Sequence, residues 1–228
     1  MLNEPQIFSA LCVKGVARDG GNVARVLEGP VPGWKIMGYG RGGGGRGATY
    51  GLPRFRQVSF DARFPFARIS LSDAAVPVAV EITGWSPFTP PEPDDSSLPV
   101  AALEFRFVNK TDKEIEAVYS FNSKNFMAVV NAHGPVVRKA KGGFELYQAG
   151  STEKPWNEGS FCAVTDDSAV RVNYAWFRGG WFDPLMMAWK SIAQGEVIAQ
   201  PPVTEGKASP GASIYVPFEL PPGGKKTI

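Results

Sequence analysis

The chain has 228 residues, of which 43% are hydrophobic and 12% aromatic, so it is long enough to enclose a core of its own. Its formal net charge is only +2 with both signs mixed, which argues against nucleic acid or an anionic membrane as a partner. No run of about 18 apolar residues occurs, so no membrane span is expected.

Short β-rich segments separated by turn residues run through most of the sequence. Residues 7–16 and 22–27 are predicted to form two strands joined at a hairpin turn, Asp19-Gly20-Gly21. Further strands are predicted at residues 56–60, 67–71, 76–83, 103–107, 115–121, 126–131, 143–148, 161–165, 170–176 and 213–219. Strands at this spacing predict a mainly β fold, a large antiparallel β-sandwich forming one domain over residues 1–228.

Two of these segments show the alternation of a hairpin. Apolar and polar residues alternate over 103–107 and again over 115–121, on either side of a turn that begins at Asn109. This pattern predicts an antiparallel hairpin with one solvated and one buried face.

One segment has helical rather than strand periodicity. Asp183 can cap a helix and Pro184 suits its first position. The apolar residues on one face of this helix would be Leu185, Trp189 and Ile192. Residues 184–194 are therefore predicted to form one short helix packed on the sandwich.

The two ends of the chain carry expectations about what surrounds it. Residues 226–228 resemble the first residues of another strand, and a sheet lacking its next strand would have an open edge. We therefore expect a fragment or one piece of a split protein. The N-terminus has no basic and apolar regions of a signal peptide, which makes the cytoplasm the default expectation, although a processed N-terminus would look the same.

Several kinds of site lack the residues that they need. His133 is the only histidine, so a catalytic triad or a zinc site has too few good candidates. Cys12 and Cys162 fit no metal or redox spacing and are predicted to be buried thiols. No catalytic residue, metal or other cofactor is predicted.

A glycine-rich segment from Gly38 to Gly47 is predicted to be a mobile loop. It lacks the Gly-Lys-Ser/Thr ending of a P-loop and a strand-to-helix context, which disfavours phosphate binding. Arg41 and Arg46 lie in this segment and are interpreted as contacts to a partner domain or a polar ligand.

The connection from Gly84 to Pro99 is long, aromatic, proline-rich and acidic. A compact domain seldom keeps such a connection unless it packs against something or borders a site. Trp85 and Phe88 are therefore interpreted as interface or substrate-rim residues, with local packing as the alternative, and Trp181 is also interpreted as a substrate-rim or interface residue. The other aromatic residues suit core, interface or sugar stacking: Trp156, Trp176, Phe177, Phe182 and Trp189.

Three segments carry a resemblance to a known family. They are GLPRFRQVSFDARFPFARISLSD at 51–73, VEITGWSPFTPPEPDDSSLPVAALEFRFVN at 80–109, and GGWFDPLMMAWKSI at 179–192 with SPGASIYVPFELPPG at 209–223. Together they resemble the N-terminal domain of glycoside hydrolase family 116, retaining β-glycosidases that include the non-lysosomal glucosylceramidases.

The resemblance implies an N-terminal β-sandwich joined to a helical (α/α)6 catalytic domain, which carries the catalytic glutamate and aspartate. That helical domain, in the same chain or as a separate chain, is the expected partner, and the sandwich is expected to pack on it and to border its substrate cleft. No catalytic residue of the family maps onto these 228 residues.

The carboxylates of the chain agree with a non-catalytic role. Glycosidases use two carboxylates about 5–5.5 Å apart for retention or about 6.5–9.5 Å apart for inversion. The adjacent pairs here, Asp94-Asp95 and Asp166-Asp167, lie in turn-like sequence, and neighbours in an extended chain point apart. Asp94 and Asp95 are interpreted as shaping the connection through side-chain to backbone bonds or as rim residues.

Two alternatives to a non-catalytic enzyme domain stay open. A free-standing carbohydrate-binding module would need exposed aromatic residues with polar neighbours. A protein-interaction module would show an exposed apolar patch of more than a few hundred Å².

Overall fold

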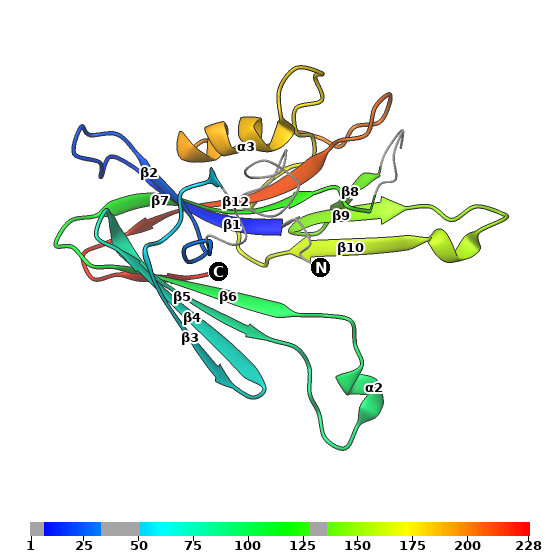
Figure 1. Ribbon diagram of the computed structural model, residues 1–228, viewed down its shortest axis with the longest axis horizontal. Helices are drawn as coiled ribbons and strands as arrows, with labels where there is room; N and C mark the ends of the chain where they lie inside the picture. The colour runs from blue at the N-terminus through cyan, green and yellow to red at the C-terminus, as the bar shows by residue number, and fades with distance from the viewer. Residues whose placement is uncertain (1–6, 33–50, 128–135) are drawn as a thin grey trace.

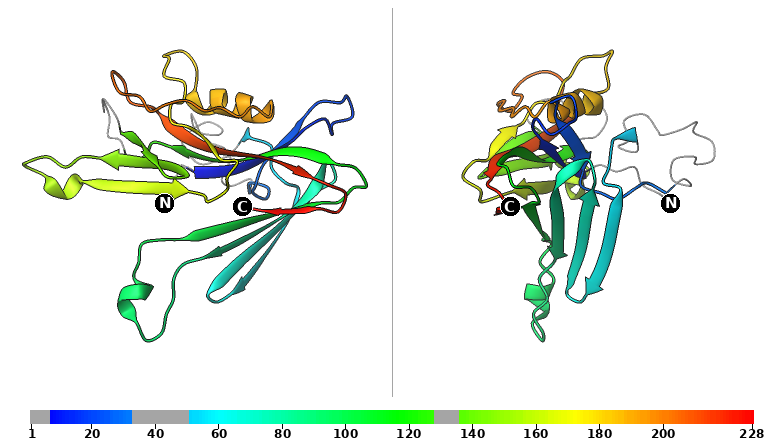
Figure 2. Two further views of the ribbon diagram at one scale, coloured as in Figure 1. Left: turned by 180° about the vertical axis from the view of Figure 1, so that it is seen from behind. Right: turned by 90° about the vertical axis from the view of Figure 1, so that its left-hand side faces the viewer.

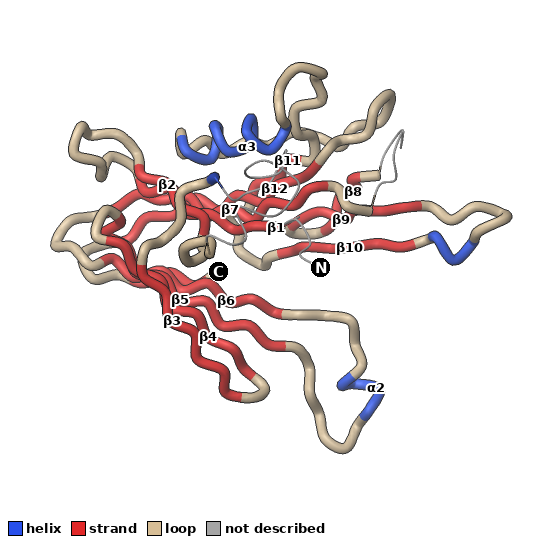
Figure 3. Tube along the Cα trace, in the orientation of Figure 1, coloured by secondary structure: helices blue, strands red, loops and turns tan. Residues whose placement is uncertain are grey.

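The computed structural model describes residues 7–32, 51–127 and 136–228, which form a mainly β fold of three antiparallel sheets (Figure 1). Figure 3 shows how strands dominate this part of the chain. The strands are β1 (Ile7–Val13), β2 (Val23–Val26), β3 (Gln57–Arg63), β4 (Phe66–Asp73), β5 (Val76–Trp85), β6 (Ala102–Asn109), β7 (Ile115–Lys124), β8 (Val137–Ala140), β9 (Gly143–Gln148), β10 (Gly159–Val164), β11 (Arg171–Asn173), β12 (Gly211–Leu220) and β13 (Lys225–Thr227). The helical elements are α2 (Pro93–Ser96), the 3-10 turn η2 (Pro155–Asn157) and α3 (Pro184–Ala193).

The strands form two sheets of five strands and one of three. Sheet A has the order β11-β12-β7-β1-β2, sheet B the order β13-β6-β5-β4-β3, and sheet C the order β10-β9-β8. Sheets A and C lie in the upper part of Figure 1, and sheet B splays away below them. Both views of Figure 2 show α3 covering the upper side of sheet A, and they show the free end of sheet B projecting away from the other two sheets.

The main core lies where the three sheets face one another. Phe105 and Phe107 of sheet B stack against Tyr119 of sheet A, with ring centroids 4.8 and 5.8 Å apart. Phe107 also contacts Phe218 at 5.1 Å, and sheet C adds the fully buried Phe144. Aromatic and aliphatic burial of this kind supplies most of the free energy that holds the layers together.

A second cluster fills the space between sheet A and α3. The predicted helix is confirmed: Asp183 Oδ1 accepts the Leu185 N–H at 2.9 Å, and Gly195 follows the helix at a φ of 69°. The buried face of α3 consists of Leu185, Ala188, Trp189 and Ile192. This cover helps to explain why Glu116 is the only exposed residue of β7, where the alternation predicts one solvated face.

A buried polar network ties sheet A to the segment that follows β11. Trp176 donates from Nε1 to Ser213 Oγ at 2.9 Å, and Ser213 Oγ donates to Asn122 Oδ1 at 2.7 Å. Asn122 in turn donates to Ser120 Oγ at 3.0 Å. Strand β11 ends at Asn173, three residues earlier than the predicted strand leading to Trp176, because the chain turns there to place the indole under α3.

The predicted hairpin of 103–107 with 115–121 is wrong. These segments are β6 and β7, which pair with other strands and lie in sheets B and A respectively. The alternation is the same whether two strands lie side by side or face each other across a core, so it does not distinguish the two arrangements. The segment between them crosses from one sheet to the other.

Asn109 holds this crossing in place. Its buried amide donates to three backbone carbonyl groups, those of Lys113, Leu220 and Pro221, at 2.7, 3.1 and 3.0 Å. Its Oδ1 accepts from both the backbone N–H and the hydroxyl of Thr111, at 2.9 and 2.8 Å. A buried amide with every group satisfied in this way fixes a connection firmly.

Other predictions for the strands have mixed outcomes. The hairpin at the start of the chain is confirmed, with β1 and β2 antiparallel and Gly20 in its turn at a φ of 80°. The strand predicted at the end of the chain is β13, and β8 is a strand that was not predicted. Residues 126 and 127 of the strand predicted at 126–131 are not strand, and the rest of it lies outside the described residues. Also outside are Arg41, Arg46, the segment 38–47 and His133.

Candidate functional site

The inner face of sheet B, the face that carries its core residues, continues beyond the part that sheets A and C cover. One row across the sheet runs in register through Phe105, Ile82, Ile69 and Phe60. Directly paired residues project from the same face. Phe105 is 5% exposed and Ile82 8%, whereas Phe60 on the edge strand β3 is 66% exposed. The apolar face is therefore sealed at one side of the sheet and open at the other.

Exposure also increases along the strands, toward the free end of the sheet. Leu103 is in register with Gly84 and Ala67, one row nearer the free end than Phe105, and it is 50% exposed. The turn between β3 and β4 ends the sheet with Phe64, whose ring meets Phe88 of the connection edge-on at 4.8 Å. We use the name apolar end for the exposed apolar residues of this free end and of the connection that follows β5: Phe60, Phe64, Phe88, Leu98, Val100 and Leu103.

The connection from residue 86 to 101 follows β5 and forms the projecting loop with α2 in Figure 1. Two serine side chains add to its backbone hydrogen bonds: Ser96 Oγ donates to the Glu92 carbonyl at 2.8 Å, and Ser97 Oγ donates to the Pro93 carbonyl at 2.6 Å. Asp94 and Asp95 lie in the first turn of α2, both exposed, and among the described residues their side chains make no hydrogen bond. Their carboxylates therefore face solvent on the loop.

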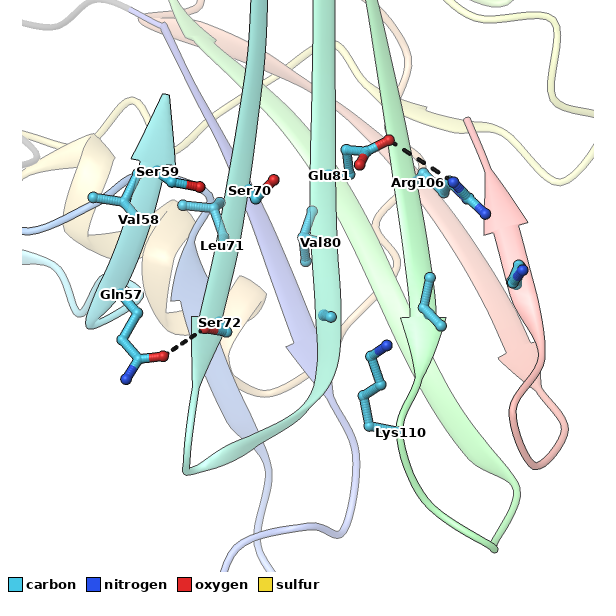
Figure 4. A pocket seen from close by; sticks show the side chains of 13 residues that line it. Gln57, Val58, Ser59, Ser70, Leu71, Ser72, Val80, Glu81, Arg106 and Lys110 are labelled. Carbon is cyan, nitrogen blue, oxygen red and sulfur yellow. Dashed lines mark hydrogen bonds and ion pairs between the residues drawn. The ribbon is translucent and has the colours of Figure 1, made fainter. Parts of the chain in front are cut away.

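The outer face of sheet B, opposite to the inner face, is mainly polar. Trp85 and Phe66 are directly paired on it at the free end and are 43% and 52% exposed. Farther along the strands the face forms an open hollow of about 600 Å³, shown in Figure 4, where Ser59, Ser70 and Glu81 lie on neighbouring strands. The structure thus places Trp85 on the outer face, whereas Phe60 and Leu103 lie on the inner face. Phe88 is only three residues after Trp85, yet it contacts Phe64 of the apolar end.

Trp181 lies on the other side of the molecule from these residues. It is 96% exposed in the loop before α3, next to Phe182, whose ring is 6.1 Å from that of Phe177. Figures 1 and 2 show this loop above α3 and the connection with α2 at the opposite extreme. The fold therefore does not bring Trp181 into one site with Trp85, Phe88, Asp94 and Asp95.

The second pair of adjacent carboxylates includes a structural ion pair. Asp167 is bonded to Lys226 of β13 and accepts the Ala169 N–H at 2.9 Å. Its burial acts to raise the pKa of the carboxyl group, but the hydrogen bonds from Lys226 and Ala169 and the charge of Lys226 outweigh this and lower the pKa. A carboxylate held ionised by a lysine serves as an anchor, not as a general acid.

Metal sites and membrane spans can be assessed only for the described part of the chain. There, no three His, Cys, Asp or Glu side chains gather closely enough to hold a metal ion. In those same ranges no helix has the length and apolar character to cross a bilayer.

Cys12 is buried, and burial raises the pKa of its thiol to about 11 against an opposing effect of Lys14. The prediction of two buried thiols is wrong for Cys162, which points outward from β10.

The sequence pattern does not mark Phe60, Phe64 or Leu103 as functional residues. They fit the apolar half of a strand or turn pattern, so they were indistinguishable from core residues. The available signal was Pro65 directly after Phe64, because Pro marks a turn and a large apolar residue in a hairpin turn is unusual.

One family of known proteins matches nearly the whole chain. The family described as "beta-glucosidase 2, glycosyl-hydrolase family 116 N-term" matches residues 7–228. A search of the curated proteins gave no significant match.

Proposed function

Because the chain belongs to the family of glycosyl-hydrolase family 116 N-terminal domains, we propose that it is the non-catalytic β-sandwich of a β-glycosidase and that it packs on a helical catalytic domain. In this proposal the helical domain contributes both catalytic carboxylates. The sandwich contributes a rigid surface that holds that domain and borders its substrate cleft.

The observation that carries the proposal is the apolar end of sheet B. Six large apolar residues that monomeric proteins usually bury are each more than 49% exposed there. An exposed apolar surface of this kind, continuous with a packed core, marks a place where another protein surface belongs. Its aromatic content is also that of interface centres, which favour Phe, Tyr and Trp.

The course of the last strand supports the same location. β13 pairs antiparallel with β6 from Val108 to Arg106, and Ile228 exchanges both backbone hydrogen bonds with Phe105 at 2.8 and 2.9 Å. The strand therefore runs toward Leu103. A segment joined to Ile228 would leave the sandwich beside the apolar end.

The predicted rim residues divide between two roles in this proposal. Phe88 belongs to the apolar end and would be buried by the helical domain. Asp94 and Asp95, exposed on α2, would lie at the border of the contact and face the cleft. Arg41, Arg46 and Trp181 remain predicted interface residues without a structural argument that joins them to this surface.

Reconstitution of activity tests the proposal. The purified 228-residue chain should not hydrolyse an aryl β-glucoside, because in this proposal the helical domain carries the carboxylate pair. Adding the helical domain of a family 116 β-glucosidase, joined to the chain or as a separate protein, should give a complex that elutes together and turns over the substrate. Turnover by the chain alone, after removal of contaminating hydrolases, would refute the proposal.

A further inference from the structure

The outer face of sheet B carries a second arrangement that docking through the inner face leaves unexplained. Residues on alternate positions of β5 share this face, and Glu81, Thr83 and Trp85 therefore lie in line along it. On the neighbouring strand β4, their direct partners are Ser70, Arg68 and Phe66. Two parallel rows of side chains thus extend from the hollow in Figure 4 to the free end of the sheet.

The hollow presents groups that can both donate and accept hydrogen bonds. Glu81 Oε1 lies 3.8 Å from Arg68 Nε and 3.8 Å from Arg106 Nη1, which is too long for a direct hydrogen bond. The carboxylate is therefore balanced by charge while its hydrogen-bonding capacity stays available. The hydroxyl groups of Ser59 and Ser70 project beside it and, within the described ranges, bind no other protein group.

These groups match the requirements of a sugar ring. Each sugar hydroxyl donates one hydrogen bond and accepts others, so it is best held by a carboxylate and a guanidinium group side by side. Glu81 and Arg106 are directly opposite each other on β5 and β6, which places an acceptor and a donor at neighbouring positions. Lys110 and Lys225 also line the hollow, so its lining is net positive, and these cations supply further donors for the hydroxyl oxygens of a sugar.

An aromatic platform completes the arrangement at the free end. Trp85 and Phe66 form a direct cross-strand pair whose rings are about half exposed. The electron-rich faces of such rings attract the C–H groups of a sugar. Trp85 is four residues from Glu81, so platform and hollow are separated by about 13 Å along the strand. That separation exceeds one sugar ring and suits a short chain of them.

We propose that the outer face of sheet B binds an oligosaccharide that lies along β4 and β5. One end of the oligosaccharide stacks on Trp85 and Phe66, and the other is hydrogen-bonded to Glu81 and Arg106. Arg68 and Thr83 lie between these two sites and contact the middle of the oligosaccharide. A flat, extended β-linked glucan matches this straight path best. The inference does not rest on the docking proposed above, because the two faces of sheet B point in opposite directions.

Titration of the whole 228-residue chain with cellotetraose tests this inference, with calorimetry for affinity and tryptophan fluorescence for location. Saturable binding of one cellotetraose per chain is expected, with glucose binding at least about tenfold more weakly because it reaches only one end of the path. Cellotetraose binding that weakens steeply with added salt would indicate a charge-driven site and would overturn the proposal.

Two variants and a matched control locate the binding. Trp85→Ala and Glu81→Gln should each weaken cellotetraose binding about tenfold or more, because each removes one end of the path. Trp181→Ala, which removes an exposed tryptophan on the other side of the molecule, should leave the affinity unchanged. Circular dichroism melts check that all three variants fold.

Two results would overturn the proposal: a flat cellotetraose titration of the folded wild-type chain, or unchanged affinity in the Trp85→Ala, Glu81→Gln double variant. Neither result bears on the docking of the helical domain, because no helical domain is present in the titration.

Discussion

Phe107 and Phe60 lie on the same face of the same sheet but in opposite environments. Phe107, on β6, is fully buried between sheets B and A, whereas Phe60, on the edge strand β3, is 66% exposed. Both obey the same alternation of apolar and polar residues. The difference teaches that alternation determines which face of a strand is apolar, while the neighbouring layers determine whether that face is covered.

The physical cause of the difference is the way the sheets diverge. Sheets A and B are joined where the chain crosses between them at residues 109–114, and Figure 2 shows sheet B leaving the other sheets toward its free end. The covered part of sheet B gains its stability from the core. The uncovered apolar end contributes little to the stability of the domain, and for that reason we assign it to a partner.

The largest expected effect on stability comes from the covered part. Phe107→Ala should lower the free energy of unfolding by about 3–5 kcal/mol, because it removes a fully buried ring and leaves a cavity. Phe60→Ala is the matched control and should change it by less than about 0.5 kcal/mol. Urea denaturation of both variants measures the contrast, and equal losses would contradict the description of a covered and an uncovered region.

The crossing between the sheets should be the next most sensitive feature. Asn109→Ala removes the amide that binds three carbonyl groups and Thr111, so we expect a loss of about 2–3 kcal/mol in unfolding free energy. Thr111→Val, which removes only the hydroxyl group at the edge of this network, should cost less. A smaller loss for Asn109→Ala than for Thr111→Val would show that other contacts fix the crossing.

The ion pair between Asp167 and Lys226 should make stability depend on pH. The folded state lowers the pKa of Asp167 below its unfolded value of about 3.9, so its contribution is fully present above that value. It is lost as the pH falls through the folded pKa. The difference in stability between wild type and Asp167→Asn should therefore be constant near neutral pH and shrink below about pH 4. A difference that stays constant down to pH 2 would argue against the ion pair.

Much of the architecture could be predicted from local sequence patterns. The helix was predictable because Asp183, Pro184 and the apolar positions of α3 are local signals, and β1 with β2 was predictable from its glycine turn. The pairing of β6 and β7 with other strands was not, because Asn109 makes its decisive bonds with Lys113 and with residues about 110 positions away. These hydrogen bonds form only in the folded chain, so local sequence patterns do not reveal them.

The candidate site was predictable only in part, for the same reason. Its connection was recognisable from length and composition, which pointed to Trp85 and Phe88. Sequence could not separate these two residues, because the face that each occupies depends on the register of β4 with β5 and on the contact with Phe64. Phe60 and Leu103 were hidden because exposed and buried apolar residues follow one pattern.

The most direct test of the account is the affinity between this chain and a family 116 helical domain, measured by calorimetry with variants of sheet B. The double variant Phe60→Ser, Leu103→Ser should keep the unfolding free energy of the chain within about 1 kcal/mol of wild type. It should nevertheless weaken binding about 30-fold or more, as expected when central apolar contacts of an interface are removed. Ser59→Ala with Ser70→Ala, on the outer face, should bind like wild type. Wild-type affinity in the Phe60→Ser, Leu103→Ser variant would contradict the claim that the apolar end of sheet B holds the catalytic domain.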